Sequence, residues 1–185
     1  IGEPDLVIQI PEPVSVPAQG VMDYKRIDMV SPRRENAWVT AIQILPEVPA
    51  VVHHVLVYIV EDGKQPVLLD GMVPGKSPTA YPAGMAKFLP GNARLHFGIH
   101  YTPNGTAVTD QLRVGLKLAA APPEREVFST VLDRFDFRIP AGHPDFPVEY
   151  RFKLPEAVQL RVLLAHMHLR GSRFSVDAVL PDGTR

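Results

Sequence analysis

Short apolar runs, most of them alternating with polar residues at a period of two, recur along the whole chain. Such alternation is typical of β-strands with one buried face, because successive side chains of a strand point to opposite faces. No window has the 3.6-residue period of an amphipathic helix. The pattern therefore predicts an all-β fold, an antiparallel β-sandwich of roughly ten strands. The expected strands span residues 6–10, 21–30, 37–45, 51–60, 85–89, 93–101, 112–118, 127–132, 135–139, 148–154, 160–169 and 174–180.

A proline-containing stretch at 120–124 suggests a boundary between two domains. We expect residues 1–121 to form a jelly-roll-like β-sandwich. Residues 122–185 would begin a second β-sandwich domain that continues beyond Arg185, because a turn signal stands just before that residue and a strand should follow it. The polar segment 61–84 lacks periodicity and is predicted to be a long loop. Within the strand expected at 21–30, the candidate core residues are Tyr24, Ile27 and Met29.

The composition narrows the possible functions. The formal net charge of −1 does not favour nucleic acid or an anionic membrane as a partner. No apolar run approaches the ~20 residues that a membrane-spanning helix needs. The chain contains no cysteine, which excludes disulfides, thiolate zinc sites and cysteine nucleophiles.

Histidines are concentrated inside the expected strands. Six of the seven lie in apolar runs, as the pairs His53 and His54, His96 and His100, and His166 and His168. A buried imidazole needs a partner for each ring nitrogen, and the usual partner of a convergent set is a metal ion. Because imidazole-rich sites suit copper or zinc best, a centre for one of these metals is the chemistry that the sequence suggests.

The spacing of each pair decides whether it can share one ion. His166 and His168 are two residues apart, so they project from one face of a strand, ~6.5 Å apart along it, and can chelate one ion. The alternative is two histidines hydrogen-bonded at a sheet surface. Adjacent residues such as His53 and His54 point to opposite faces, so they reach one ion only where the strand bulges or twists strongly. The alternative there is one histidine in the core and one exposed.

The third pair cannot act together in a regular strand. His96 and His100 occupy one face but lie ~13 Å apart, so they share an ion only if the strand bends. We favour His100 as a ligand, because it stands at the strand end, and we expect His96 to be packed or hydrogen-bonded. The remaining histidine, His143, lies in a turn sequence and is expected to be solvated.

Three motifs contain the candidate ligands: VHHV at 52–55, HYTPNG at 100–105 and HMHLRG at 166–171. In this order they resemble motifs of the copper type II, ascorbate-dependent monooxygenases, the family of peptidylglycine α-hydroxylating monooxygenase and dopamine β-monooxygenase. The resemblance covers the chain from Trp38 to about Leu180. It is closest to bacterial relatives, which often accompany cytochrome or thioredoxin-like modules.

The resemblance implies two antiparallel sandwich domains, each holding one copper. His53, His54 and His100 would bind the first copper, which stores and delivers an electron. His166 and His168 would bind the second copper, where oxygen hydroxylates a substrate C–H bond, and we expect a methionine ligand for it beyond Arg185. The substrate would be a small molecule or peptide, and the electron donor would be ascorbate-like or a cytochrome. The resemblance also implies a periplasmic or secreted protein.

Two other functions fit the same residues. One is a non-catalytic copper-binding or electron-transfer module within a larger redox assembly. The other is a β-sandwich interaction domain whose histidines are incidental. Copper content separates the interaction domain from the two copper-binding functions. Oxygen consumption with a reductant separates a monooxygenase from an electron-transfer module.

Overall fold

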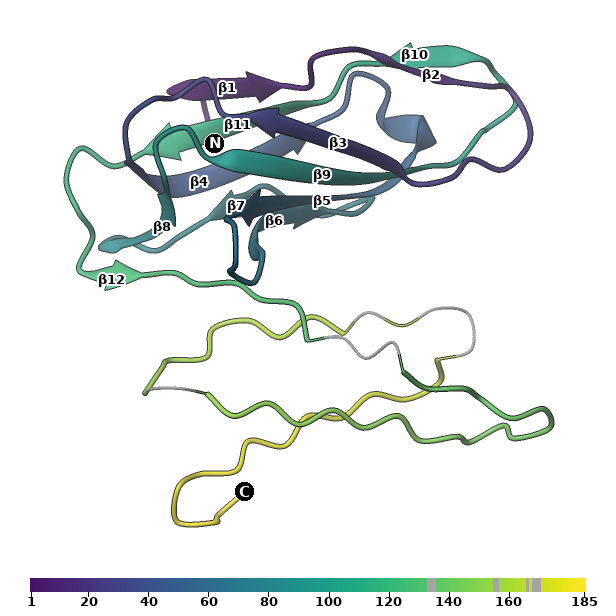
Figure 1. Cartoon of the computed structure of the whole chain (residues 1–185), viewed down its shortest axis with the longest axis vertical. Helices are drawn as coiled ribbons and strands as arrows, with labels where there is room; N and C mark the ends of the chain where they lie inside the picture. The colour runs from purple at the N-terminus through teal and green to yellow at the C-terminus, as the bar shows by residue number, and fades with distance from the viewer. Residues whose placement is uncertain (133–135, 155–156, 166, 168–170) are drawn as a thin grey trace. The chain divides into compact units, whose positions relative to one another are not determined.

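The computed structural model describes the chain except for residues 133–135, 155–156, 166 and 168–170. The chain divides into two units, Ile1–Val131 and Leu132–Arg185. All strands of the described residues lie in the first unit (Figure 1). No helix in the described part of the chain is long and apolar enough to span a membrane.

Two β-sheets form the body of the first unit. The larger has the order β1 (Leu6–Gln9), β11 (Arg113–Leu118), β4 (Ala37–Leu45), β8 (Met85–Leu89) and β12 (Arg125–Glu126), with β7 (Thr79–Ala80) beside β4. The smaller has the order β3 (Lys25–Val30), β9 (Arg94–Tyr101), β5 (Val52–Val60) and β6 (Val67–Met72). A separate ribbon pairs β2 (Val14–Val16) with β10 (Val108–Asp110), and a short 3-10 helix, η1 (Pro49–Val51), precedes β5. Strand pairing is antiparallel except between β12 and β8.

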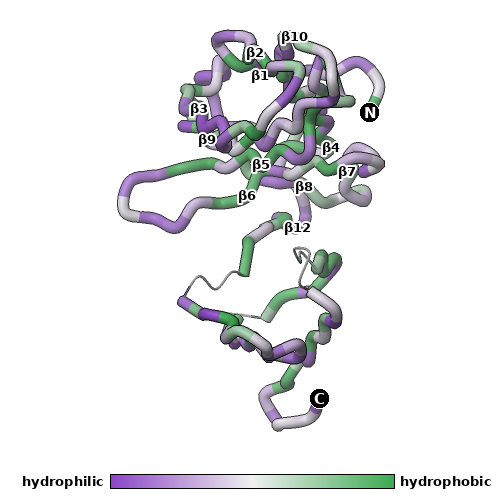
Figure 2. The backbone as a smooth tube through the Cα atoms, turned by 90° about the vertical axis from the view of Figure 1, so that its right-hand side faces the viewer, coloured by the Kyte–Doolittle hydropathy of each residue, from purple (hydrophilic) through white to green (hydrophobic). Residues whose placement is uncertain are grey.

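A hydrophobic core joins the two sheets. Ile42 and Leu116 of the larger sheet and Val57 and Phe97 of the smaller sheet are buried in one cluster. Hydrophobic stretches of the chain coincide with strands of both sheets (Figure 2). Each large apolar side chain that is fully buried contributes roughly 1.5–3 kcal/mol to stability. The fold is therefore an all-β sandwich, as predicted, and its core holds β5 and β9 in the middle of the smaller sheet.

The strand predictions are accurate where the apolar signal is strong. Stretches 37–45 and 85–89 coincide with β4 and β8. The strands expected at 51–60 and 93–101 each begin one residue later, as β5 and β9. These four strands carry many β-branched and aromatic side chains, which favour a pleated, half-buried surface.

The prediction of a continuous loop over 61–84 is wrong, because this segment contains β6 and β7. The apolar run of β6 is short and is interrupted by Asp70 and Gly71, which together resemble a turn signal. The strand forms nevertheless, because it adds to the edge of β5 and buries Leu69 in the core. Pairing with a strong neighbour overrides the weak local pattern.

The strands predicted after residue 126 are absent from the described residues. The described parts of the five stretches between 127 and 180 contain no strand. Most of their described large apolar side chains are exposed, including Val162 and Leu164, each at 79%. Alternation gives a segment strand propensity, but a stable strand also needs a partner backbone and an apolar layer over its face.

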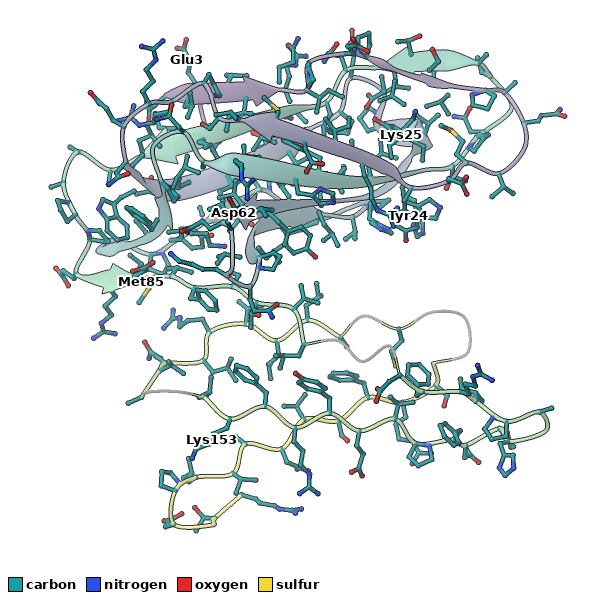
Figure 3. The ribbon with its side chains drawn as sticks, viewed as in Figure 1. Glu3, Tyr24, Lys25, Asp62, Met85 and Lys153 are labelled. Carbon is teal, nitrogen blue, oxygen red and sulfur yellow. The ribbon has the colours of Figure 1, made fainter. Side chains whose placement is uncertain are left out.

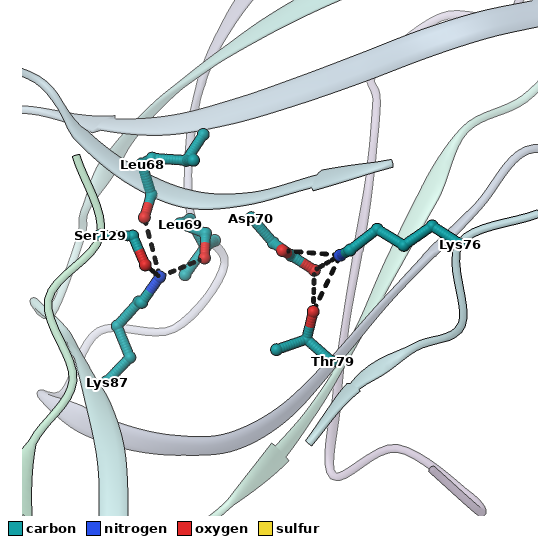
Figure 4. Close-up of polar contacts among 7 residues, drawn as sticks. All are labelled: Leu68, Leu69, Asp70, Lys76, Thr79, Lys87 and Ser129. Atoms are coloured by element: carbon teal, nitrogen blue, oxygen red, sulfur yellow. Dashed lines mark hydrogen bonds and ion pairs between the residues drawn. The ribbon is translucent and has the colours of Figure 1, made fainter. Parts of the chain in front are cut away.

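A buried lysine connects the two sheets (Figure 4). Lys87 of β8 is 2% exposed, and its Nζ donates hydrogen bonds to the carbonyl oxygens of Leu68 and Leu69 in β6 and to Ser129 Oγ. Burial lowers the pKa of Lys87 to about 8, although the nearby Asp70 carboxylate opposes the shift. The three acceptors take the place of water around the ammonium group.

Because of this lowered pKa, the stability of the protein should change with pH in the alkaline range. Between about pH 8 and the ordinary lysine pKa of about 10.4, the unfolded chain binds more protons at Lys87 than the folded chain does. The contribution of Lys87 to the free energy of unfolding should therefore increase as the pH rises from about 7 to about 9.5. In Lys87→Met this increase in the free energy of unfolding with pH should vanish, whereas in the exposed control Lys64→Met it should remain. Denaturant unfolding followed by the fluorescence of Trp38 measures it, and an equal pH slope in all three proteins contradicts the prediction.

Candidate metal centre

The first candidate ligands lie side by side on β5 and β9. His54 is directly opposite His100, and Val52 is opposite Tyr101, so His53 is an extra residue on β5. This register shift is a β-bulge, which turns the side chain of the extra residue out of the regular alternation. The bulge satisfies the condition under which two adjacent histidines can reach one ion.

The three imidazoles converge in space. His53, His54 and His100 each offer one ring nitrogen, and these nitrogens lie within 4.8 Å of one another. The Nδ1 atoms of His53 and His54 are 3.1 Å apart. Bonds of about 2.0–2.1 Å at near-tetrahedral angles would place two ligand nitrogens of one ion roughly 3.3 Å apart. The cluster can therefore hold a metal ion without a large rearrangement of these two rings.

Partial burial favours the neutral, metal-binding form of the His100 imidazole in this centre. His54 is buried, His100 is half-buried, and His53 is exposed. Burial, followed by the charge of His53, lowers the pKa of the His100 imidazole, which keeps that ring in the neutral form that binds metals. The Nδ1 atom of His100 is buried and has no hydrogen-bond partner among the described residues. A buried imidazole nitrogen without a protein partner is available to bind an ion or a water molecule.

Comparison with known proteins assigns the chain to no family. Neither a protein-family model nor a curated protein matches the chain. The interpretation of the centre therefore rests on its residues and their geometry. Within the described residues, the cluster consists of three imidazoles with no carboxylate, a donor set for a transition metal rather than for calcium or magnesium.

One aromatic residue of the centre is not predicted from the sequence. Tyr24 (labelled in Figure 3), which we expect in the core, is 44% exposed, and its ring lies against those of His54 and His100 instead. Its ring stacks on His100 with centroids 4.7 Å apart and an interplanar angle of 17°. It also meets His54 at 5.4 Å. The sequence gives no signal of this position, because Tyr24 falls inside the strand expected at 21–30, whereas β3 begins at Lys25.

The other histidines of the described chain lie apart from the cluster. His96 is held by Asp28, with its Nδ1 2.7 Å from the carboxylate oxygen, in agreement with the predicted hydrogen-bonded role. His143 is exposed in its turn, also as predicted. His166 and His168 lie outside the described residues, so their chelate stays a prediction.

Proposed function

We propose that this chain is a copper-binding part of a copper-dependent monooxygenase, in which His53, His54 and His100 hold the electron-storing copper. The observation that carries the proposal is the convergence of three imidazole nitrogens within 4.8 Å, made possible by a bulge in β5. His166 and His168 are proposed to hold the second copper, where an organic C–H bond is hydroxylated. One atom of O2 enters the substrate and the other leaves as water, so the reaction consumes two electrons from the donor and two protons.

The donor set supports copper over other metals. Three neutral imidazoles suit copper and zinc, and the order of the VHHV, HYTPNG and HMHLRG motifs resembles that of the copper monooxygenases. Bound copper would supply one-electron redox chemistry, which zinc lacks. The ligand-bearing strands β5 and β9 are paired along most of their length, so they restrict movement of the three rings.

The exposure of each ring supports electron delivery through this centre. His54 and the Nδ1 side of His100 are covered, so this side of the centre is shielded from solvent. His53 is exposed, which leaves a route by which an electron donor can approach. The proposed donor is ascorbate-like or a cytochrome, and the proposed substrate is a small molecule or a peptide. A periplasmic or secreted location would fit such partners.

A second candidate function is a non-catalytic copper-binding or electron-transfer module of a larger redox assembly. The observation that favours it is that the three-histidine cluster lies wholly within the unit Ile1–Val131. Such a centre could cycle electrons without the chemistry proposed for His166 and His168.

Copper titration of the full chain tests the proposal. We expect one equivalent of copper to bind tightly, with nitrogen hyperfine structure from several imidazoles in the electron paramagnetic resonance spectrum of the Cu(II) form. His54→Ala should weaken this site and change the spectrum. Failure of the wild-type chain to bind copper, or an unchanged spectrum in His54→Ala, would contradict the proposal. Oxygen consumption with ascorbate then separates the monooxygenase from the electron-transfer module.

A further inference from the structure

We infer that Tyr24 is a positioning residue of the three-histidine centre, fixing the plane of the His100 ring by stacking on it. This inference rests on the proposed metal-binding function and assigns a role to a residue outside the ligand set. The two rings are nearly parallel, at 17°, with centroids 4.7 Å apart. Offset stacking at this distance is a favoured arrangement of aromatic rings.

Strand register places Tyr24 where it can act. β3 pairs with β9 so that Lys25 is opposite Ile99, which puts the preceding residue, Tyr24, beside His100. On the other side of β9, His100 is opposite His54. The imidazole therefore lies in a row between a tyrosine and a second ligand. Side chains directly opposite each other on neighbouring strands are close enough to restrict each other's rotation.

The other ring contacts of His100 are edge-on, with His53 at 5.0 Å and 75° and with His54 at 5.3 Å and 70°. Metal-binding histidines are usually oriented by a hydrogen bond from the ring nitrogen that does not bind the ion. Among the described residues, no hydrogen bond to the buried Nδ1 atom of His100 fixes this ring in the metal-free protein. Two residues earlier on the same face of β9 stands Gly98, and the space where its Cβ would lie is open. The side toward Gly98 is open, and the stack with Tyr24 is the near-parallel contact of the ring, so we assign the orienting role to Tyr24.

Three variants separate the loss of the aromatic face of Tyr24 from the loss of its hydroxyl group and from the loss of a tyrosine elsewhere on the sheet. Tyr24→Leu removes the aromatic face, and Tyr24→Phe keeps it while removing the hydroxyl group. Tyr58→Leu makes the same change as Tyr24→Leu on the same face of the smaller sheet, where Tyr58 is opposite His96 rather than a ligand. Copper affinity is measured by competition with a chelator of known affinity, and the geometry of the site by electron paramagnetic resonance of the Cu(II) form.

We expect Tyr24→Leu to lose roughly 10-fold in copper affinity, the lower end of the loss seen when an orienting partner of a ligand is removed. Its spectrum should broaden, because the His100 ring then samples several orientations. Tyr24→Phe and Tyr58→Leu should match the wild type in both measurements. Wild-type affinity and spectrum in Tyr24→Leu would overturn the inference, and so would a loss in Tyr24→Phe equal to that in Tyr24→Leu.

A measurement on the metal-free protein keeps this test independent of the proposed function. Stacking beneath a tyrosine ring should shift the ring-proton resonances of His100 upfield in the wild type and in Tyr24→Phe. In Tyr24→Leu these resonances should move back toward their ordinary positions. If the wild type binds no copper, the proposed function fails, whereas the shifts still decide whether Tyr24 orients His100. Equal His100 shifts in all proteins would overturn the inference.

Discussion

Replacing His100 by alanine is expected to lower the copper affinity of the three-histidine centre at least about 100-fold, because even the loss of an orienting partner costs 10–100-fold. The substitution removes one of three nitrogens that lie within 4.8 Å of one another. The two remaining imidazoles come from the adjacent residues His53 and His54, so the ion would be held by one short segment of β5. Competition with a chelator of known affinity measures the change.

Two matched controls define the ligand assignment. His96 lies on the same face of β9 as His100 but is hydrogen-bonded to Asp28, and His143 is exposed in a turn. His96→Ala and His143→Ala should therefore keep the wild-type affinity. If His96→Ala lost the metal while His100→Ala retained it, the assignment of His100 would be wrong. Circular dichroism of each variant verifies that the β-sandwich still forms.

Replacing Asp110 by alanine should lower the free energy of unfolding of the first unit by roughly 3–6 kcal/mol, since it removes two hydrogen bonds to a buried carboxylate, each worth about 1.5–3 kcal/mol. Asp110 is 0% exposed. Its carboxylate accepts hydrogen bonds from the Tyr101 hydroxyl at 2.8 Å and from the backbone N–H of Val48 at 2.7 Å. Alanine would leave the buried Tyr101 hydroxyl and this N–H group without their acceptor.

Denaturant unfolding followed by Trp38 fluorescence measures this loss, because Trp38 is the chain's one tryptophan and belongs to β4. Asp62→Ala is the matched control, since Asp62 is exposed and its ion pair with Arg94 should contribute less than about 1 kcal/mol. Tyr101→Phe should lie between the two, because it removes one of the two donors. Equal stability of Asp110→Ala and Asp62→Ala would contradict the prediction.

This buried network also bears on the metal centre. Val48 directly precedes η1, which leads into β5 and its histidines, and Val51 accepts a hydrogen bond from Thr102 at the end of β9. Asp110 thus anchors the chain just before the bulge. In Asp110→Ala, the segment that presents His53 loses a fixed attachment point at its start.

The amino-acid pattern predicts the fold better than it predicts the centre. Stretches such as Ala37–Leu45 alternate strongly, and the structure has a strand there. The bulge cannot be read from the alternation of β5 alone, because it depends on which residue of β9 each residue of β5 faces. Sequence reasoning can state that His53 and His54 need a bulge to share an ion, but only the pairing of two distant strands supplies it.

For Tyr24, the pattern makes a definite prediction that is wrong. An aromatic residue in an apolar stretch is most often part of a core, so the pattern assigns it there. In the structure Ile27 and Met29 of β3 do pack against the core, whereas Tyr24 precedes the strand and meets the histidines. Core membership depends on which face a residue takes up at a strand end, and local sequence does not define that face.

The three candidate ligands come from two neighbouring strands, β5 and β9, that are far apart in sequence. An ion bound to His53, His54 and His100 would act as a cross-link between β5 and β9, in a protein that has no cysteine to form one. Its binding energy would add to the stability of the folded state, in proportion to the logarithm of the free metal concentration. Sliding of one strand past the other would break the coordination, so metal supply and the alignment of the central strands would be thermodynamically coupled.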